Sequence, residues 1–199
     1  MVGVPGRRIT TTDFAEHVFG VVLVNDWSAR DIQAWEYRPL GPFLAKSFAT
    51  SVSPWVTPLD ALAPVPAAAQ DPEPLAYLRP PGPAYDLRLS VEWNDTVVST
   101  PPFASMYWTA AQQLAHLTSN GASVRTGDLY ASGTVSGAAP DEVGSFLELT
   151  RNGAEPVKLA DGTLRGFLEN GDRVRIGGTA RSAAGPRIAL GPVSGTIVG

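Results

Sequence analysis

The sequence predicts a β-rich α+β domain, and three observations support this prediction. The 199-residue chain contains 20 Gly and 18 Pro, a content that favours turns and short strands over long helices. Residues Tyr85 to Trp93 alternate between apolar and polar side chains, which predicts a half-buried strand. After Val124, turn signals that contain Gly separate short apolar runs, a pattern typical of hairpins. Residues 1–199 carry no internal repeat, so we expect one domain.

A strand, a turn and a helix are expected before residue 40. The apolar run Val18–Val24 predicts a buried strand. Ser28 and Asp31 then have the three-residue spacing of a capping box, which marks the start of a helix. Because Pro39 disfavours helical geometry at the residue before it, this helix should end near Tyr37.

The middle of the chain combines an irregular segment with a helix. Nine of the 18 prolines fall between Pro54 and Pro83, so we expect residues 54–84 to be irregular or extended over the surface. A helix is expected further on, because apolar residues recur at helical spacing and Asn120-Gly121 supplies a stop signal. The apolar positions of this helix are Met106, Ala110, Leu114 and Leu117.

The composition excludes several classes of function. Lys and Arg number 15 against 19 Asp and Glu, for a formal net charge of -4, so no basic excess is available for nucleic acid. The absence of Cys excludes disulfides, thiolate nucleophiles and Cys-ligated metals. His17 and His116 are the only histidines, too few for a three-His metal site. No run approaches the length of about 18 apolar residues that a membrane span needs, and no leader pattern opens the chain. We expect a cytoplasmic protein with no membrane partner.

Four polar residues could line one surface. Arg30, Gln33 and Tyr37 are spaced three and four residues apart, which puts them along one face of a helix, with Asp26 at its strand-side entrance. An ordinary solvent-exposed helix would show the same residues. A binding site is the alternative, because a carboxylate just past a buried strand and beside a helix start lies where ligands commonly bind.

Lys46 and Glu148 are further candidates. Lys46 lies among small and apolar residues, and it could either stabilise a developing enolate or carboxylate charge or extend to solvent. Glu148 lies downstream of Gly133-Thr134, and strand alternation would put it on the face opposite Leu147 and Leu149. An exposed Glu is the default there, whereas a buried one would need a cation or an imidazole to orient.

Several motifs, in the same order along the chain, closely resemble the fumarylacetoacetase family. The resemblance covers nearly the whole chain. It is specific, because smaller relatives that act on other 2,4-dioxo acids usually lack the Trp-Glu-Tyr and Met-Tyr-Trp-Thr elements. The matching segments are Val24–Gln33, Trp35–Tyr37, Pro39–Leu44, Ser51–Trp55, Met106–Thr109, Gln112–Leu114, Gly127–Leu129, Ala131–Gly137 and Gly144–Leu149.

The resemblance implies a fold, a reaction and partners. The fold would be the mixed β-sandwich roll of the family's C-terminal domain, incomplete at its N-terminal side. The reaction would be hydrolysis of a carbon–carbon bond of 4-fumarylacetoacetate to fumarate and acetoacetate, the last step of tyrosine and phenylalanine breakdown. The enzyme would be a homodimer that depends on Mg²⁺ or Ca²⁺ and takes a small dioxo-acid substrate.

The resemblance also implies roles for individual residues. Asp26 matches a metal ligand, and Lys46 and Thr50 match the loop around that metal. Arg30, Gln33 and Lys46 are suited to stabilise the departing acetoacetate carbanion. Glu148 matches the carboxylate that orients the catalytic His. The residues that match substrate-binding positions are Arg30, Gln33, Tyr37 and Thr134.

The departures from the family pattern bear on activity. The family's catalytic His, a second Asp ligand and a pair of metal-binding Glu residues precede the region that this chain matches, and neither His17 nor His116 falls in the matching motif. The chain would then correspond to the C-terminal half of the enzyme and be inactive, or nearly so, on its own. The alternatives are a non-catalytic remnant or dimerisation module, and a hydrolase or decarboxylase of another 2,4-dioxo acid.

Overall fold

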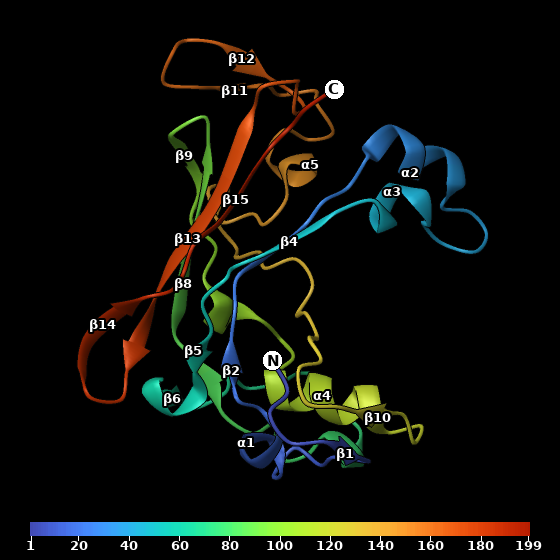
Figure 1. The fold of residues 1–199 in the computed structure, drawn as a ribbon, viewed down its shortest axis with the longest axis vertical. Coiled ribbons are helices and arrows are strands. Elements are labelled where there is room, and N and C mark those ends of the chain that lie inside the picture. The colour runs from blue at the N-terminus through green and yellow to red at the C-terminus, as the bar shows by residue number, and fades with distance from the viewer.

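The structure, a computed structural model, describes all 199 residues and has the β-rich fold that the sequence predicts. Its largest sheet has five antiparallel strands, in the order β14, β13, β8 and β9, with β15 also paired to β13. Figure 1 shows β8 and β13 side by side along one edge of the molecule. The strands of this sheet are β8 (Leu87–Trp93), β9 (Thr96–Ser99), β13 (Arg173–Ser182), β14 (Gly185–Ala189) and β15 (Val193–Thr196).

Strand β8 confirms the alternation read from the sequence. Leu87, Val91 and Trp93 are buried, whereas Arg88 between them is exposed. The strand ends at Trp93, and the turn that begins at Asn94 has positive φ there and leads into β9. The buried face of the strand packs toward the core: Leu87 belongs to the core cluster, and Trp93 stacks on Phe146.

Helix α4 (Ala110–Thr118) is the longest helix and confirms that a helix lies here. Of its four expected apolar positions, Ala110 and Leu114 contact the core, whereas Met106 precedes the helix and Leu117 is exposed. The Thr109 side chain accepts a hydrogen bond from the backbone N–H of Gln112, and the Gln112 side chain accepts one from the backbone N–H of Thr109, which is a complete capping box. Leu114 is fully buried in the core cluster. Gly121, with φ of +90°, follows the helix end at the expected stop.

The remaining elements are short. Residues 54–84 contain only β5, η1, β6, η2 and the first residue of β7 between irregular stretches. No helix has the length and apolar content that a membrane span requires. The short elements are β1 (Gly6–Arg7), α1 (Phe14–His17), β2 (Gly20–Val21), β3 (Val24–Asp26), α2 (Arg30–Glu36), α3 (Leu44–Ser47), β4 (Thr50–Val52), β5 (Thr57–Pro58), η1 (Leu59–Ala61), β6 (Pro64–Val65), η2 (Ala76–Leu78), β7 (Ala84–Tyr85), η3 (Phe103–Ser105), β10 (Ser123–Val124), α5 (Phe146–Leu149), β11 (Val157–Lys158) and β12 (Leu164–Arg165).

The expectation of one buried strand over Val18–Val24 is wrong. The chain forms two separate strands there, β2 and β3, because β2 pairs with β5 whereas β3 pairs with β4. An apolar run does not reveal that its two ends pair with different partners.

Two local expectations about helices are also wrong. Helix α2 begins at Arg30 without a side-chain cap, because the Ser28 hydroxyl instead accepts a hydrogen bond from Lys46. Glu148 lies in helix α5 and not in a strand, because the Ser145 hydroxyl accepts a hydrogen bond from the Glu148 backbone N–H and caps the turn.

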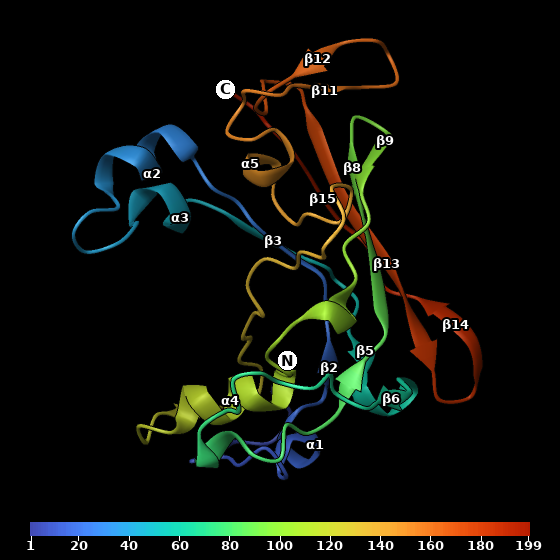
Figure 2. The same cartoon turned by 180° about the vertical axis from the view of Figure 1, so that it is seen from behind.

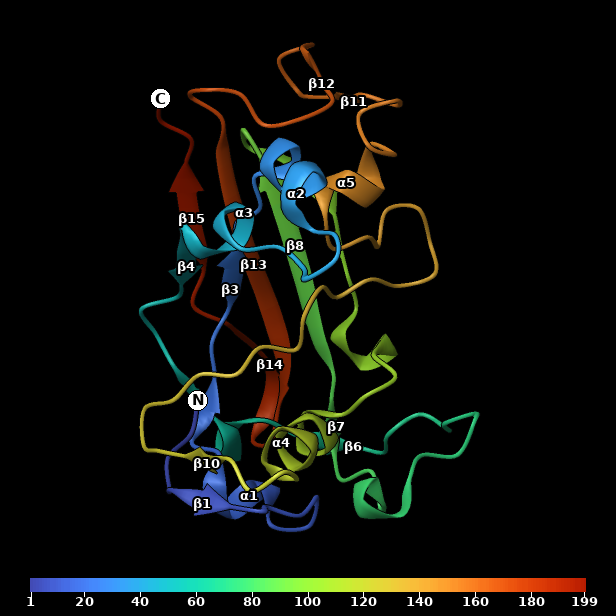
Figure 3. The ribbon, with the colours of Figure 1, turned by 90° about the vertical axis from the view of Figure 1, so that its right-hand side faces the viewer.

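Residues 24–52 form an arm that projects from the rest of the molecule. Strands β3 and β4 are its antiparallel stalk and carry helices α2 and α3 at the tip (Figures 1 and 2). Helix α2 buries no residue. Trp35 on this helix is 90% exposed and Leu40 beyond it is 80% exposed. Helices α2 and α5 lie toward the same end of the large sheet (Figure 3), but the arm holds α2 away from α5 (Figure 1).

Candidate functional site

A cavity of about 520 Å³ opens between the arm and α5. Three residues predicted from the sequence line it, although they are far apart in the chain: Arg30 from α2, Thr134 from an irregular segment, and Glu148 from α5. The cavity therefore joins the arm, the segment before α5, and α5 itself. Its lining is Arg30, Ser105, Met106, Tyr107, Thr134, Ser136, Ser145, Leu147 and Glu148.

Arg30 is held in place by a neighbour on its own helix. Its Nη1 donates a hydrogen bond of 2.7 Å to Oε1 of Gln33, one turn further along α2. Gln33 does not itself line the cavity. The pair confirms that Arg30 and Gln33 share a helix face, and it leaves the other guanidinium nitrogens of Arg30 available for an anionic ligand.

Glu148 is held by serine hydroxyls and not by a cation. The Ser136 hydroxyl lies 3.2 and 3.1 Å from its two carboxylate oxygens, and the Ser145 hydroxyl donates to Oε2 over 2.9 Å. The Ser136 hydroxyl in turn accepts a hydrogen bond of 3.0 Å from the backbone N–H of Gly144. The carboxylate is exposed toward the cavity. Sequence reasoning missed both serines, although they lie in the segments Ala131–Gly137 and Gly144–Leu149.

Helix α5 is anchored to the large sheet by its first residue, and the residue after its end is buried. The ring of Phe146 stacks on Trp93 with centroids 4.4 Å apart and planes at 10°. Thr150, after the last turn, is fully buried and donates a hydrogen bond of 2.8 Å to the Phe146 carbonyl. These contacts orient Glu148 toward the cavity. They also correct the expectation that Glu148 lies on the strand face opposite Leu147 and Leu149.

Lys46 and Asp26 form a separate cluster on the arm. The Lys46 ammonium lies 2.8 Å from Oδ2 of Asp26, and it donates to the Asp26 carbonyl over 3.0 Å and to the Ser28 hydroxyl over 2.7 Å. Thr50 lies directly opposite Asp26 in the β3–β4 pair. Of the two alternatives left open for Lys46, solvent extension alone is therefore wrong, because the ammonium has an acidic partner. Neither Lys46 nor Asp26 lines the cavity.

The residues of this chain do not by themselves suit Mg²⁺ or Ca²⁺. Such a cation takes about six oxygen ligands, with several carboxylates among them in most protein sites. Asp26 offers one carboxylate, and the Lys46 ammonium already neutralises its charge. No group of three or more His, Cys, Asp or Glu side chains is arranged to hold a metal ion.

Tyr37 lies outside the cavity, and a different tyrosine lines it. The guanidinium of Arg38 lies over the Tyr37 ring at 5.2 Å, on the exposed end of α2. Tyr107 forms part of the cavity wall. Gln70 of the proline-rich segment donates a hydrogen bond of 2.5 Å to the Tyr107 carbonyl, and the Tyr107 hydroxyl donates to the Pro72 carbonyl. The segment 54–84 therefore supports the cavity wall, a role that its composition did not indicate.

Neither histidine lies near Glu148. The His17 ring nitrogen is 3.0 Å from the Val4 carbonyl, and the His116 ring nitrogen is 2.8 Å from the Tyr77 hydroxyl. Both belong to the end of the molecule that carries α1 and α4 (Figure 2), away from α5. This agrees with the expectation that neither has a catalytic setting.

The chain matches a family model and full-length relatives. The model described as "Fumarylacetoacetate (FAA) hydrolase C-terminal" matches residues 1–198. Fumarylacetoacetase of Homo sapiens is 49% identical over 202 residues, and that of Arabidopsis thaliana 48%. Each alignment covers 97% of this chain but 48% of the relative. The chain thus spans about half the length of the curated relatives that it matches.

Solved structures with lower sequence identity share the fold. Fumarylacetoacetate hydrolase from Exiguobacterium antarcticum superposes with a TM-score of 0.62 at 17% identity, over 100% of this chain and 53% of its own. The 5-carboxymethyl-2-hydroxymuconate delta-isomerase from Mycobacterium smegmatis gives 0.57 at 16% identity, over 99% and 55%. The sequence and fold matches together establish that the chain belongs to the fumarylacetoacetate hydrolase C-terminal family.

Proposed function

We propose that this chain supplies the substrate-binding wall of a hydrolase that cleaves 4-fumarylacetoacetate into fumarate and acetoacetate. The observation that carries the proposal is the meeting of Arg30, Thr134 and Glu148 at one cavity. A guanidinium and a hydroxyl suit a substrate that is a dicarboxylate with two keto groups, and a carboxylate suits the orientation of a group that activates water. The identity of 48–49% to fumarylacetoacetases supports the same substrate.

The residues of the cavity divide the work in this proposal. Arg30, oriented by Gln33, binds a substrate carboxylate and the negative charge that develops on the departing acetoacetate. Thr134 donates a hydrogen bond to a substrate oxygen. Glu148, fixed by Ser136 and Ser145, orients the group that activates water. The resemblance assigns that group to a histidine that the cavity lining does not contain.

Further proposals concern residues outside the lining and a partner. Lys46 adds positive charge near the departing carbanion. Once a second copy covers the arm, Tyr37 contacts the substrate and Thr50 lies in the region of the metal. Asp26 supplies one oxygen to Mg²⁺ or Ca²⁺, with the other ligands coming from outside these residues. The arm, with Trp35 and Leu40 almost fully exposed, is the surface that a second copy covers in a homodimer.

The binding part of the proposal can be tested on the chain itself. We expect fumarate and acetoacetate to bind in calorimetric titrations, and Arg30→Gln to weaken binding at least about tenfold, or about 1.4 kcal/mol. Arg38→Gln, a matched loss of charge on the same arm, should leave the affinity unchanged. Equal effects of the two substitutions would contradict the role of Arg30.

The catalytic part predicts an absence of turnover. We expect no hydrolysis of 4-fumarylacetoacetate by the purified chain with added Mg²⁺ or Ca²⁺, because no histidine lies in its cavity. The spectrophotometric loss of the diketone measures this directly. Turnover within about tenfold of a full-length relative, which is 1.4 kcal/mol in the barrier, would show that another group in the chain acts as the base.

A further inference from the structure

Glu36, at the end of α2, binds the beginning of α3 through three hydrogen bonds. Its carboxylate accepts them from the backbone N–H groups of Phe43 at 2.7 Å, Leu44 at 3.2 Å and Ala45 at 2.8 Å. These donors are the groups that a helix start leaves without an intrahelical partner. Glu36 therefore caps α3 from a different helix.

Little else fixes α3. It is a helix of four residues, and its N-cap residue Phe43 makes no side-chain capping hydrogen bond. A helix of this length is not stable by itself in water. One further backbone hydrogen bond, from the N–H of Ala29 to the carbonyl of Ala45, connects it to the start of α2 over 3.0 Å. Ala45 is fully buried between these contacts, so Ala29 and Glu36 hold the start of α3, in addition to the contacts that Lys46 of the same helix makes.

The position of Lys46 follows from that of α3. Lys46 comes directly after Ala45. Its ammonium donates hydrogen bonds to the Asp26 carbonyl and the Ser28 hydroxyl, and it forms an ion pair with the Asp26 carboxylate. The side chain is 27% exposed. If α3 moved, the long Lys46 side chain would regain its freedom and the ion pair would compete with water.

We propose that Glu36 is a positioning residue, which caps α3 and thereby keeps Lys46 against Asp26 and Ser28. The catalytic meaning of this arrangement rests on the proposed function, but the arrangement itself does not. A carboxylate suits the task better than an amide, because a charged acceptor bonds backbone N–H groups about twice as strongly and both oxygens can accept. The same bonds, that from Ala45 above all, hold the pKa of Glu36 below its ordinary value.

The two lysines of the chain provide an internal reference for a test. Lys46 and Lys158 are its only lysines, and Lys158 is exposed on β11. Amine labelling followed by peptide mass spectrometry gives the ratio of their rates. We expect Glu36→Ala to raise the Lys46 to Lys158 ratio at least about fivefold, through local opening of α3, and Glu36→Gln to raise it less because one acceptor remains.

Asp31→Asn is the matched control. Asp31 lies on the same helix, is exposed, and accepts a hydrogen bond only from the N–H of Ile32, so its neutralisation should leave the labelling ratio unchanged. A ratio that is unchanged in Glu36→Ala, or raised equally by Asp31→Asn, would overturn the proposal. Near-ultraviolet circular dichroism checks that each variant keeps its tertiary structure.

A second measurement needs no variant. In the unaltered chain, the amide hydrogens of Phe43, Leu44 and Ala45 should exchange with solvent at least about tenfold more slowly than in an unstructured peptide, because Glu36 accepts all three. Exchange at the unstructured rate would overturn the cap, whatever the variants do. No substrate is present in either experiment, so a negative result would count against the role of Glu36, whereas failure of fumarate or acetoacetate to bind would count against the proposed function.

Discussion

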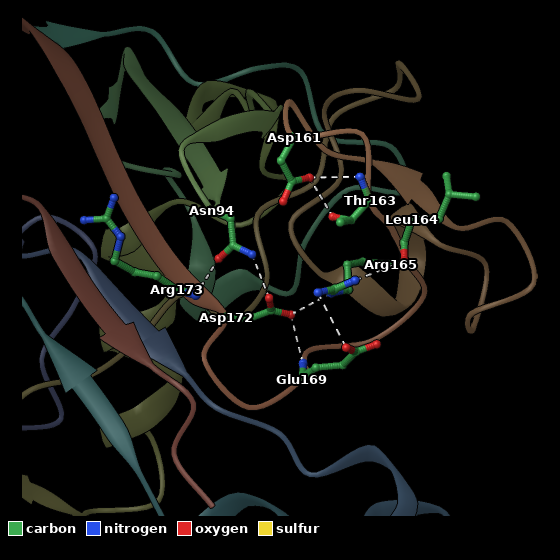
Figure 4. Close-up of polar contacts among 8 residues, drawn as sticks. All are labelled: Asn94, Asp161, Thr163, Leu164, Arg165, Glu169, Asp172 and Arg173. Carbon is green, nitrogen blue, oxygen red and sulfur yellow. Dashed lines mark hydrogen bonds and ion pairs between the residues drawn. The ribbon is translucent and has the colours of Figure 1, made fainter.

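Asp172 should be among the most sensitive polar residues of the chain, and the structure gives the size of the effect. It is 2% exposed and accepts hydrogen bonds from the side-chain amide of Asn94 over 2.7 Å and from the backbone N–H of Glu169 over 2.9 Å. The guanidinium of Arg165 lies 3.4 Å away. Figure 4 shows that these contacts join the β8–β9 turn to the segment that leads into β13, which begins at Arg173.

Asp172→Ala removes the acceptor of two short hydrogen bonds. Each hydrogen bond to a charged group contributes about 1.5 kcal/mol or more, so the loss should be about 3 kcal/mol. Arg165 adds little to this sum, because it also lies near the Glu169 carboxylate at 3.5 Å. For a chain of this size, 1 kcal/mol shifts the midpoint of thermal unfolding by about 2–4 °C. We therefore expect the midpoint of Asp172→Ala to fall by about 6–12 °C.

Thermal and urea unfolding at pH 7, followed by circular dichroism, measure this loss. Asp161→Ala is the control, because Asp161 lies nearby (Figure 4) and accepts two hydrogen bonds from Thr163 but is exposed. It should cost less than about 1 kcal/mol. A loss below about 1 kcal/mol for Asp172→Ala would refute the reasoning, because the two donors would then have found water at no cost.

The contribution of Asp172 should also depend on pH. Burial alone would raise its pKa, but the hydrogen bonds from Glu169 and Asn94 outweigh burial and hold the pKa below the ordinary value of 3.8. A carboxyl with a depressed pKa stabilises the fold above its unfolded pKa and loses this effect as pH falls through the folded one. The stability gap between the unaltered chain and Asp172→Asn should therefore be full at pH 7 and narrow below about pH 3.8.

Three further substitutions test other parts of the fold by urea unfolding at pH 7. Glu148→Gln should change the free energy of unfolding by less than about 1 kcal/mol. The exposed carboxylate accepts hydrogen bonds from hydroxyl groups, and an amide oxygen can accept the same bonds. A larger loss of stability would reveal a cationic partner. Gln112→Leu should cost about 2 kcal/mol, because Gln112 is 1% exposed and hydrogen-bonded, whereas half-buried Gln113→Leu should cost less than about 0.5 kcal/mol. Gly20→Ala should cost at least about 2 kcal/mol, because a Cβ there would lie 2.3 Å from the Thr57 carbonyl oxygen in the β2–β5 pair. No loss of stability would mean that strands β2 and β5 can move apart without cost.

The elements that sequence reasoning predicted correctly are those whose pattern is local and long. The seven-residue strand β8 and the nine-residue helix α4 each repeat their period several times. The grouping of Arg30 and Gln33 on one face follows from the same helical period. The family resemblance alone led us to expect one cavity shared by Asp26, Arg30, Gln33, Lys46 and Thr134, because no local pattern relates residues so far apart. Of these five residues, only Arg30 and Thr134 line the cavity.

The errors have a common physical cause, which is competition from a partner distant in sequence. Ser28 has the spacing of a cap, but Lys46 takes its hydroxyl. The alternation around Glu148 resembles a strand, but Ser145 caps a helical turn and Phe146 stacks on Trp93. Four residues offer too few periods to distinguish the two structures, so a single tertiary contact decides between them.

The cavity is assembled from parts that the hydrophobic core does not reach. Helix α2 buries no residue, and Thr134 lies in a segment without regular structure. Polar contacts hold these walls instead: Gln33 binds Arg30, Ser136 binds both the Gly144 amide and Glu148, and Gln70 binds the Tyr107 carbonyl. Each such hydrogen bond contributes only about 1 kcal/mol to folding. Changes at these positions should therefore alter the geometry of the cavity more than the stability of the protein, whereas changes at Asp172 and Gln112 should do the reverse.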